Sequence, residues 1–251
     1  LHDALPISNG LFRDISIVES GTLNLGTVSM PAGTTGNFTA RSVNGDIIDT
    51  GLAGFKPGGV VGTSGSGLVS LTASNGNIII DDPTSDFPTI GGVVFNAKNV
   101  TLAPLGSSSL YLGAVGQTSV ATGNLTVTTA LGSGSILSNG ALDVTGDASF
   151  QAASADITLA QSGNKFGTLK FVGQNVSIVE SDDTVLVTGS AALLGAQIAS
   201  SGSISIANRG GIIQFNANGG NTFLSATGNI TLPKLIRSEE HTSELQSPCN
   251  L

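Results

Sequence analysis

Carboxylate side chains gather at two points of the chain, and their types and spacing are those that could support chemistry. One group is Asp81, Asp82 and Asp86, and the other is Glu180, Asp182 and Asp183. Calcium prefers oxygen ligands of this kind, so the first group supplies the candidate calcium ligands. Its spacing matches neither an EF-hand loop nor the glycine-rich calcium-binding repeat of some β-helices. We therefore expect no metal centre. Asp81, Asp82 and Asp86 are the candidate ligands if calcium does bind.

Catalysis by these carboxylates would resemble that of polysaccharide lyases or hydrolases, several of which are β-helices. General acid and base catalysis needs two groups within reach of each other whose pKa values are pushed apart. The basic residues are instead scattered singly along the chain, at Arg41, Lys56, Lys98, Lys165, Lys170 and Arg209. We expect no catalytic residue and no enzyme activity, and a carbohydrate-active β-helix enzyme is the alternative.

Two glycine-rich stretches raise the question of a phosphate-binding loop. Gly58-Gly59 and residues 65–67 lack the lysine of a P-loop and its strand-to-helix context. We interpret both stretches as turns and expect no cofactor.

Both ends of the chain resemble translated sequencing-library adapters. The string RSEEHTSELQS covers Arg237 to Ser247, and LHDALPI covers Leu1 to Ile7. We therefore set residues 1–8 and 237–251 aside as adapter-like artefacts. Residues 9–236 are interpreted as one repeat segment.

The excluded ends contain both histidines, His2 and His241, and the single cysteine, Cys249. Residues 9–236 then carry 8 Lys and Arg against 13 Asp and Glu, a net charge of −5. An acidic surface does not attract nucleic acid or anionic lipid, so those partners are disfavoured. The chain has no apolar run of about 18 residues, so we expect no membrane insertion.

Short strands with alternating apolar residues recur along the chain, and residues 155–189 contain four in a row. Their apolar residues are Ile157 and Leu159, Leu169 and Phe171, Val176 and Ile178, and Val185 and Val187. Such strands cannot bury their apolar faces alone, but they can do so as stacked coils. The composition agrees, because 35 glycines and only 4% aromatic residues suit a narrow interior with frequent corners.

A five-residue motif recurs ten times, and each copy ends in an alternating strand. The copies are GTLNL, GDIID, GNIII, KNVTL, GNLTV, GALDV, ADITL, QNVSI, GSISI and GNITL, starting at residues 21, 45, 76, 98, 123, 140, 155, 174, 202 and 228. We expect the glycine to supply a positive φ at a corner, with the aliphatic residues inward and Thr, Ser or Asn outward. The variable spacing implies loops inserted into some coils.

These patterns predict an all-β fold, a right-handed parallel β-helix (β-solenoid) of roughly ten irregular coils. The alternative is a β-sandwich, since Asn44-Gly45, Asn75-Gly76 and Asn139-Gly140 are turn dipeptides typical of hairpins. Period-two strands at rung-like spacing outnumber these hairpin signals and favour the solenoid.

Two longer segments also match each other. Residues 90–102 superpose on residues 166–178, which aligns Phe95 with Phe171 and Val100 with Val176. Asn99, Asn175 and Asn229 then occupy equivalent motif positions. We expect these asparagines to stack in a ladder that stabilises the fold.

The strings ASNGNIII, GNKFGTLKFVGQNVSIVESDD and ATGNITL resemble the repeats of filamentous-haemagglutinin-like large exoproteins, which are β-helical adhesins exported by two-partner secretion. The resemblance covers most of residues 37–232, and similar repeats occur in autotransporter passengers. It implies a structural shaft at the bacterial cell surface or outside the cell. It also implies an outer-membrane exporter for the parent protein, and weak multivalent binding to glycans or proteins of host or neighbouring cells.

Overall fold

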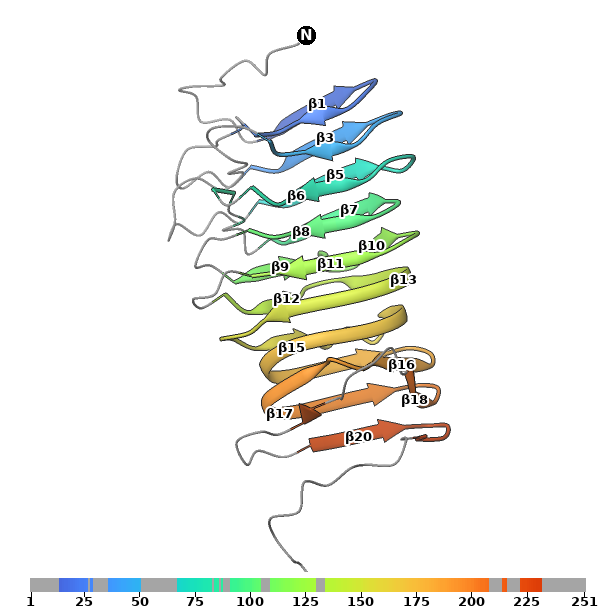
Figure 1. Ribbon diagram of the computed structural model, residues 1–251. Coiled ribbons are helices and arrows are strands. Elements are labelled where there is room, and N and C mark those ends of the chain that lie inside the picture. Colours follow the sequence, from blue (N-terminus) through green and yellow to red (C-terminus); the bar gives the residue numbers. More distant parts are fainter. Residues whose placement is uncertain are drawn as a thin grey trace, which may run out of the picture.

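Parallel strands stacked along one axis make up the described part of the chain (Figure 1). The computed structural model describes residues 14–26, 28, 36–50, 67–82, 84–85, 87, 91–104, 109–129, 134–207, 214–215 and 222–231. Within these residues the strand pairs are parallel and no helix occurs. The predicted all-β solenoid is confirmed, and the sandwich alternative is wrong because its hairpins would pair antiparallel strands.

The strands vary from two-residue bridges between corners to one strand of 16 residues. The first ten are β1 (Ile15–Glu19), β2 (Leu23–Asn24), β3 (Phe38–Ser42), β4 (Ile47–Ile48), β5 (Val69–Ala73), β6 (Ile78–Ile80), β7 (Val93–Ala97), β8 (Val100–Leu102), β9 (Leu110–Leu112) and β10 (Thr118–Ala121). The others are β11 (Leu125–Thr128), β12 (Ile136–Ser138), β13 (Ala141–Ala152), β14 (Ile157–Leu159), β15 (Lys165–Glu180), β16 (Thr184–Val187), β17 (Ala191–Ser200), β18 (Ile204–Ala207), β19 (Gln214–Phe215) and β20 (Thr222–Ala226).

The register of the pairs sorts the strands onto three faces. The first face contains β1, β3, β5, β7, β10 and the beginnings of β13 and β15. The second face contains β2, β4, β6, β8, β11, the later part of β13, the middle of β15, then β16 and β18. The third face contains β9, β12, β14, the end of β15, the later part of β17 and β20, while the beginning of β17 pairs with the middle of β15 and with β19. Long strands such as β13 and β15 therefore bend from one face to the next.

One column of paired residues on the second face follows the chain from turn to turn. It runs through Leu23, Ile47, Ile78, Val100, Leu125, Ala148, Leu169 and Leu186. Between hydrogen-bonded corner residues of adjacent turns, the chain advances by 31, 22, 25, 23 and 21 residues from Asp46 to Thr168. The predicted variation in coil length is confirmed.

The solenoid has about seven turns, fewer than the roughly ten that the motif count predicted. The ten motif copies do not mark equivalent points of the turn. GNLTV begins β11 on the second face, GALDV begins β13 on the first face, and ADITL leads into β14 on the third. Any corner followed by a strand has this sequence pattern, so counting copies does not count turns.

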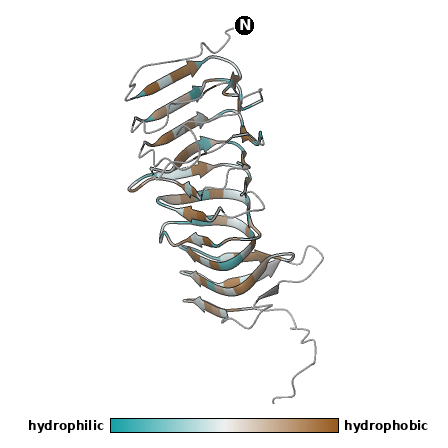
Figure 2. Cartoon of the chain, turned by 90° about the vertical axis from the view of Figure 1, so that its left-hand side faces the viewer, coloured by the Kyte–Doolittle hydropathy of each residue, from teal (hydrophilic) through white to brown (hydrophobic). Residues whose placement is uncertain are grey.

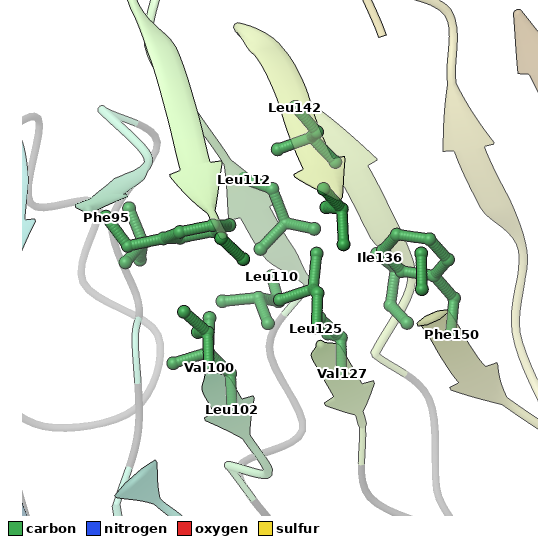
Figure 3. Packing of buried hydrophobic residues seen from close by; sticks show 14 of the residues in the cluster. Phe95, Val100, Leu102, Leu110, Leu112, Leu125, Val127, Ile136, Leu142 and Phe150 are labelled. Carbon is green, nitrogen blue, oxygen red and sulfur yellow. The ribbon is translucent and has the colours of Figure 1, made fainter. Parts of the chain in front are cut away.

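Alternate residues of each strand pack inside the coil. In β3, for example, Phe38 and Ala40 are buried, Thr39 between them is partly exposed and Arg41 is exposed. Apolar residues recur along the strands of successive turns, with polar residues between many of them (Figure 2). In the middle of the solenoid Phe95, Leu112, Leu125 and Phe150 belong to one continuous core (Figure 3). Since each turn buries its apolar face against its neighbours, the stack is held together along its whole axis.

The two segments that match in sequence lie on different faces, which corrects the predicted superposition. Phe95 pairs with Leu71 on the first face, whereas Phe171 pairs with Phe150 on the second. Residues 166–178 are therefore displaced by one face relative to residues 90–102. The local pattern is the same on every face, because each face needs the same alternation of inward and outward side chains.

The predicted register of residues 184–187 is wrong. Val185 is partly exposed, while Thr184, Leu186 and Val187 are buried. Leu186 pairs with Leu169, which places it in the inward column of the second face. Thr184 points inward because its hydroxyl donates a hydrogen bond to the buried Glu180 carboxylate, 2.7 Å away.

The motif glycines do not adopt positive φ, contrary to expectation. Among the described glycines only Gly92, Gly113, Gly116 and Gly189 have positive φ, so the recurrence of glycine in the motif has another cause. A Cβ on Gly76 would overlap the carbonyl of Gly45 in the preceding turn. A Cβ on Gly45 would lie 2.5 Å from the backbone nitrogen of Thr22. These glycines let the backbones of adjacent turns approach at a corner.

Candidate functional site

Of the carboxylates predicted as calcium candidates, Asp82 holds a turn after β6. Asp81 is exposed and Asp82 is partly buried, and Asp86 lies outside the described residues. The Oδ1 atom of Asp82 accepts hydrogen bonds from the backbone N–H of Thr84, at 2.8 Å, and from its hydroxyl, at 2.6 Å. Asp82 therefore closes a local turn of the chain.

The carboxylate at the centre of this corner is Asp49, which sequence reasoning missed. Asp49 is fully buried, and its two oxygens accept the backbone N–H groups of Asp81 and Asp82, each at 3.1 Å. The Ser85 hydroxyl donates to Asp49 Oδ2 at 2.6 Å. Burial raises the pKa of Asp49, although these three hydrogen bonds oppose the shift. Asp49 thus anchors the next turn's loop to the end of β4.

The second acidic group separates into one buried and two exposed carboxylates. Glu180 is fully buried at the end of β15, whereas Asp182 and Asp183 are exposed in the corner that follows. Glu180 Oε1 accepts the backbone N–H of Phe166 at 2.8 Å, and Oε2 accepts the Thr184 hydroxyl at 2.7 Å. The Glu180 side chain therefore links the beginning and end of β15 to β16.

Burial raises the pKa of Glu180 to about 7. The hydrogen bonds from Thr184 and Phe166 lower the pKa, while the negative charges of Asp182 and Asp183 raise it further. A carboxyl group with this pKa can hold a proton near neutral pH, as a general acid must, but the Glu180 carboxyl lies inside the coil. Its two oxygens are used by the fold.

Asn164 is a second buried polar residue beside Glu180. Its Oδ1 accepts the backbone N–H of Leu142 at 3.0 Å, and its Nδ2 donates to the carbonyls of Leu159 and Val179 at 3.0 and 3.1 Å. The side chains of Asn164 and Glu180 both form hydrogen bonds with backbone groups near the place where β15 leaves the first face. Buried polar side chains of this kind are retained because the backbone groups would otherwise be unsatisfied.

The basic residues that the structure describes are distributed over several strands and corners. Arg41 and Lys98 are exposed on separate turns, Lys165 and Lys170 are exposed on β15, and Lys56 and Arg209 lie outside the described residues. Within the described ranges, no three His, Cys, Asp or Glu side chains gather as metal ligands would. No helix that is long and apolar enough to cross a membrane is found there either.

A ladder of polar side chains runs along the corner before the second face. It consists of Asp46, Asn77, Asn99, Asn124, Asp147 and Thr168, which we call the corner ladder. Asn99 shows the pattern, since its Nδ2 donates to Asn77 Oδ1 at 2.8 Å and its Oδ1 accepts the backbone N–H of Asn124 at 2.9 Å. Each member thus binds the neighbouring turn through its side chain.

The predicted stacking of Asn99, Asn175 and Asn229 on one another is wrong, although all three make contacts between turns. Asn99 belongs to the corner ladder. Asn175 donates from both its backbone nitrogen and its Nδ2 to Asp156 Oδ1, each at 3.0 Å. The backbone N–H of Asn229 donates to the Ser203 hydroxyl at 3.3 Å. The three asparagines lie in separate ladders because their motif copies lie on different turns and faces.

Comparison with known families gives one match, to a family described as repeats of unknown function (DUF5649), over residues 97–171. This segment runs from the end of β7 to the middle of β15 and includes Asn99, Asn124 and Asp147 of the corner ladder. No curated protein and no solved structure matches the chain. The repeat match and the stacked parallel strands together describe a repeat-containing β-helical protein.

Proposed function

We propose that the chain is a structural shaft from a bacterial secreted or surface-exposed adhesin-like exoprotein. The observation that carries this proposal is the corner ladder. It connects successive turns from Asp46 to Thr168 by side-chain hydrogen bonds of 2.7 to 2.9 Å, in addition to the parallel backbone pairing. A rod whose neighbouring turns are joined twice resists bending and separation of its turns.

The outward side chains support a passive or weakly binding role. The outward column of the second face contains Thr101, Thr126 and Ser149, and the third face presents Thr158 and Ser177. Short hydroxyl side chains on flat sheets offer hydrogen bonds without enclosing a ligand. We propose that any binding to cell-surface glycans or proteins is weak for one copy and strengthened by multiple copies.

Export and localisation follow from the resemblance to filamentous-haemagglutinin-like exoproteins. We propose an extracellular or cell-surface location, with an outer-membrane exporter as the partner of the parent protein. The net negative charge of the chain disfavours binding to nucleic acid, and we propose no such partner. We also propose that the chain has no enzyme activity, because the buried carboxylates Asp49 and Glu180 are both committed to backbone and hydroxyl donors.

A display experiment tests this proposal. The chain is coupled through one terminus to beads at high density, and binding to bacterial and epithelial cells is compared with binding of the soluble monomer. Bead binding without detectable monomer binding supports the shaft. Beads that carry the heat-unfolded chain at equal density are the control for non-specific adhesion.

The same preparation is incubated with pectin and alginate, with and without calcium, and unsaturated sugar ends are measured. No product is expected. Calcium-dependent product that is abolished by replacing both Asp81 and Asp82 with alanine would contradict the shaft and establish the lyase alternative.

A further inference from the structure

Five Asn-x-Ser/Thr triplets occur in the chain, each with a residue other than proline in the middle. They begin at Asn37, Asn99, Asn124, Asn175 and Asn229. This triplet is the acceptor sequence for N-linked glycosylation, in which the sugar is attached to the side-chain nitrogen, Nδ2. The structure separates these asparagines by how their Nδ2 atoms are used.

Two of the asparagines use Nδ2 to join adjacent turns. Asn99 donates from Nδ2 to Asn77 Oδ1 at 2.8 Å, and Asn175 donates from Nδ2 to Asp156 Oδ1 at 3.0 Å. A sugar on either atom would replace one of its two hydrogens and crowd the neighbouring turn, whose acceptor oxygen lies within 3.0 Å of the same nitrogen. Asn37 and Asn229 border segments outside the described residues, so the inference is confined to the central triplets.

Asn124 uses its other side-chain atom. Its Oδ1 accepts the backbone N–H of Asp147 at 2.9 Å, and its backbone N–H donates to Asn99 Oδ1 at 2.9 Å. Among the described residues, the Nδ2 of Asn124 has no hydrogen-bond partner. Both Asn124 and Thr126, the third residue of its triplet, are exposed. The ladder therefore holds Asn124 by its oxygen and leaves its nitrogen towards solvent.

The fold does not require a hydroxyl residue at position 126. The same outward column contains Ile48, Ile79 and Lys170 on other turns. Aliphatic and basic side chains are thus tolerated two residues after a member of the corner ladder. Thr126 completes the acceptor triplet at a position where packing leaves the residue type open.

We propose that Asn124 is an N-glycosylation site of the folded solenoid, and that Asn99 and Asn175 are protected by their bonds between turns. The sugar would come from a donor in which its C1 atom is bonded to a phosphate oxygen. The transferase forms the bond between Nδ2 and C1 as the bond from C1 to the phosphate oxygen breaks, and a base of the transferase takes one Nδ2 proton. Exposure to a glycosylation system rests on the proposed export, but the chemical selectivity of the folded chain does not.

The test uses the purified full chain, a soluble N-glycosyltransferase and its nucleotide-activated sugar, with site occupancy measured by peptide mass spectrometry. We expect occupancy of Asn124 to exceed that of Asn99 and Asn175 by roughly tenfold or more, because the latter two react only after local opening. Synthetic peptides that span each triplet control for sequence preference, and all three should be modified at similar rates.

Two variants of an exposed side chain make the test independent of folding. Thr126→Ala should abolish modification of Asn124, and Thr126→Ser should retain it, with both variants melting as the parent chain does. Equal occupancy of Asn99, Asn124 and Asn175 on the folded chain would overturn the proposal. So would an unmodified Asn124 on the folded chain when its peptide is modified, and neither outcome bears on whether the solenoid acts as a shaft.

Discussion

The carboxylate of Glu180 accepts the backbone N–H of Phe166 at 2.8 Å, although Phe166 is the second residue of strand β15 and Glu180 is its last. On earlier turns of the first face this kind of N–H donates to a backbone carbonyl of the next turn, as Phe38 does to Leu68 and Val69 does to Gly92. In the described part of the chain, the first face goes no further than the beginning of β15. A buried side chain therefore ends this face of the solenoid where a backbone carbonyl would continue it.

The raised pKa of Glu180 predicts that this junction weakens as the pH rises. The folded-state pKa of about 7 lies above the ordinary value of 4.5, so the folded state retains a proton that the unfolded chain releases between these values. The stabilisation is complete below about pH 4.5 and is lost as the pH rises through 7, by roughly 3 kcal/mol in total.

The measurement is urea unfolding of the parent chain and of Glu180→Gln between pH 4 and 8. Gln cannot ionise, so the free energy of unfolding of the parent should fall relative to that of the variant across this range. Asp14→Asn, at an exposed carboxylate of the first described turn, is the control and should follow the pH dependence of the parent. Parallel pH curves for the parent and Glu180→Gln would show that Glu180 does not titrate in this range.

Close approach of adjacent turns predicts that Gly76 cannot be replaced. In Gly76→Ala the new Cβ would overlap the Gly45 carbonyl, so the backbones must separate, at a cost of about 1–3 kcal/mol. Gly21→Ala is the control, since a Cβ there meets nothing within 4 Å and should change stability by less than about 0.5 kcal/mol. Thermal melting of the two variants distinguishes them, and equal melting temperatures would refute the requirement for close contact at Gly76.

The register of the third face predicts unequal effects for two adjacent substitutions. Val176 is 2% exposed and Ser177 is partly exposed. Val176→Asp would bury an unpaired charge at a cost of several kcal/mol, whereas Ser177→Asp should cost under about 1 kcal/mol. Chemical denaturation of both variants measures the difference. Comparable losses would mean that the inward and outward positions are misassigned.

Removal of the Asp49 carboxylate should release the loop after β6. Asp49→Ala leaves the N–H groups of Asp81 and Asp82 and the Ser85 hydroxyl without their acceptor, and we expect a loss of about 2–4 kcal/mol. Asp81→Ala removes an exposed carboxylate from the same corner and should have little effect. Hydrogen exchange at residues 81–85 locates the change. Unaltered exchange in Asp49→Ala would contradict an anchoring role.

The alternation of apolar and polar residues determined the strands and the stacked, all-β architecture. Val176 and Ile178 are inward and Ser177 is outward as predicted, because the side-chain direction in a strand follows from its local period of two. The need to bury such short strands against neighbours then leads to a solenoid. This information is local, and the sequence alone contains it.

Only the tertiary structure decided the face of each strand and the partner of each polar residue. Phe95 and Phe171 share a local pattern but lie on different faces, and Thr184 is inward because Glu180 lies beside it. Nothing in the local sequence distinguishes Asp49 from other acidic residues at corners. The backbone N–H groups of Asp81 and Asp82, more than thirty residues later, donate to its carboxylate. The motif glycines Gly45 and Gly76 are needed because the backbone of an adjacent turn lies where a Cβ would be, and only the stacking of the turns reveals this. These features depend on the register between turns, which insertions of different length shift without changing the local pattern.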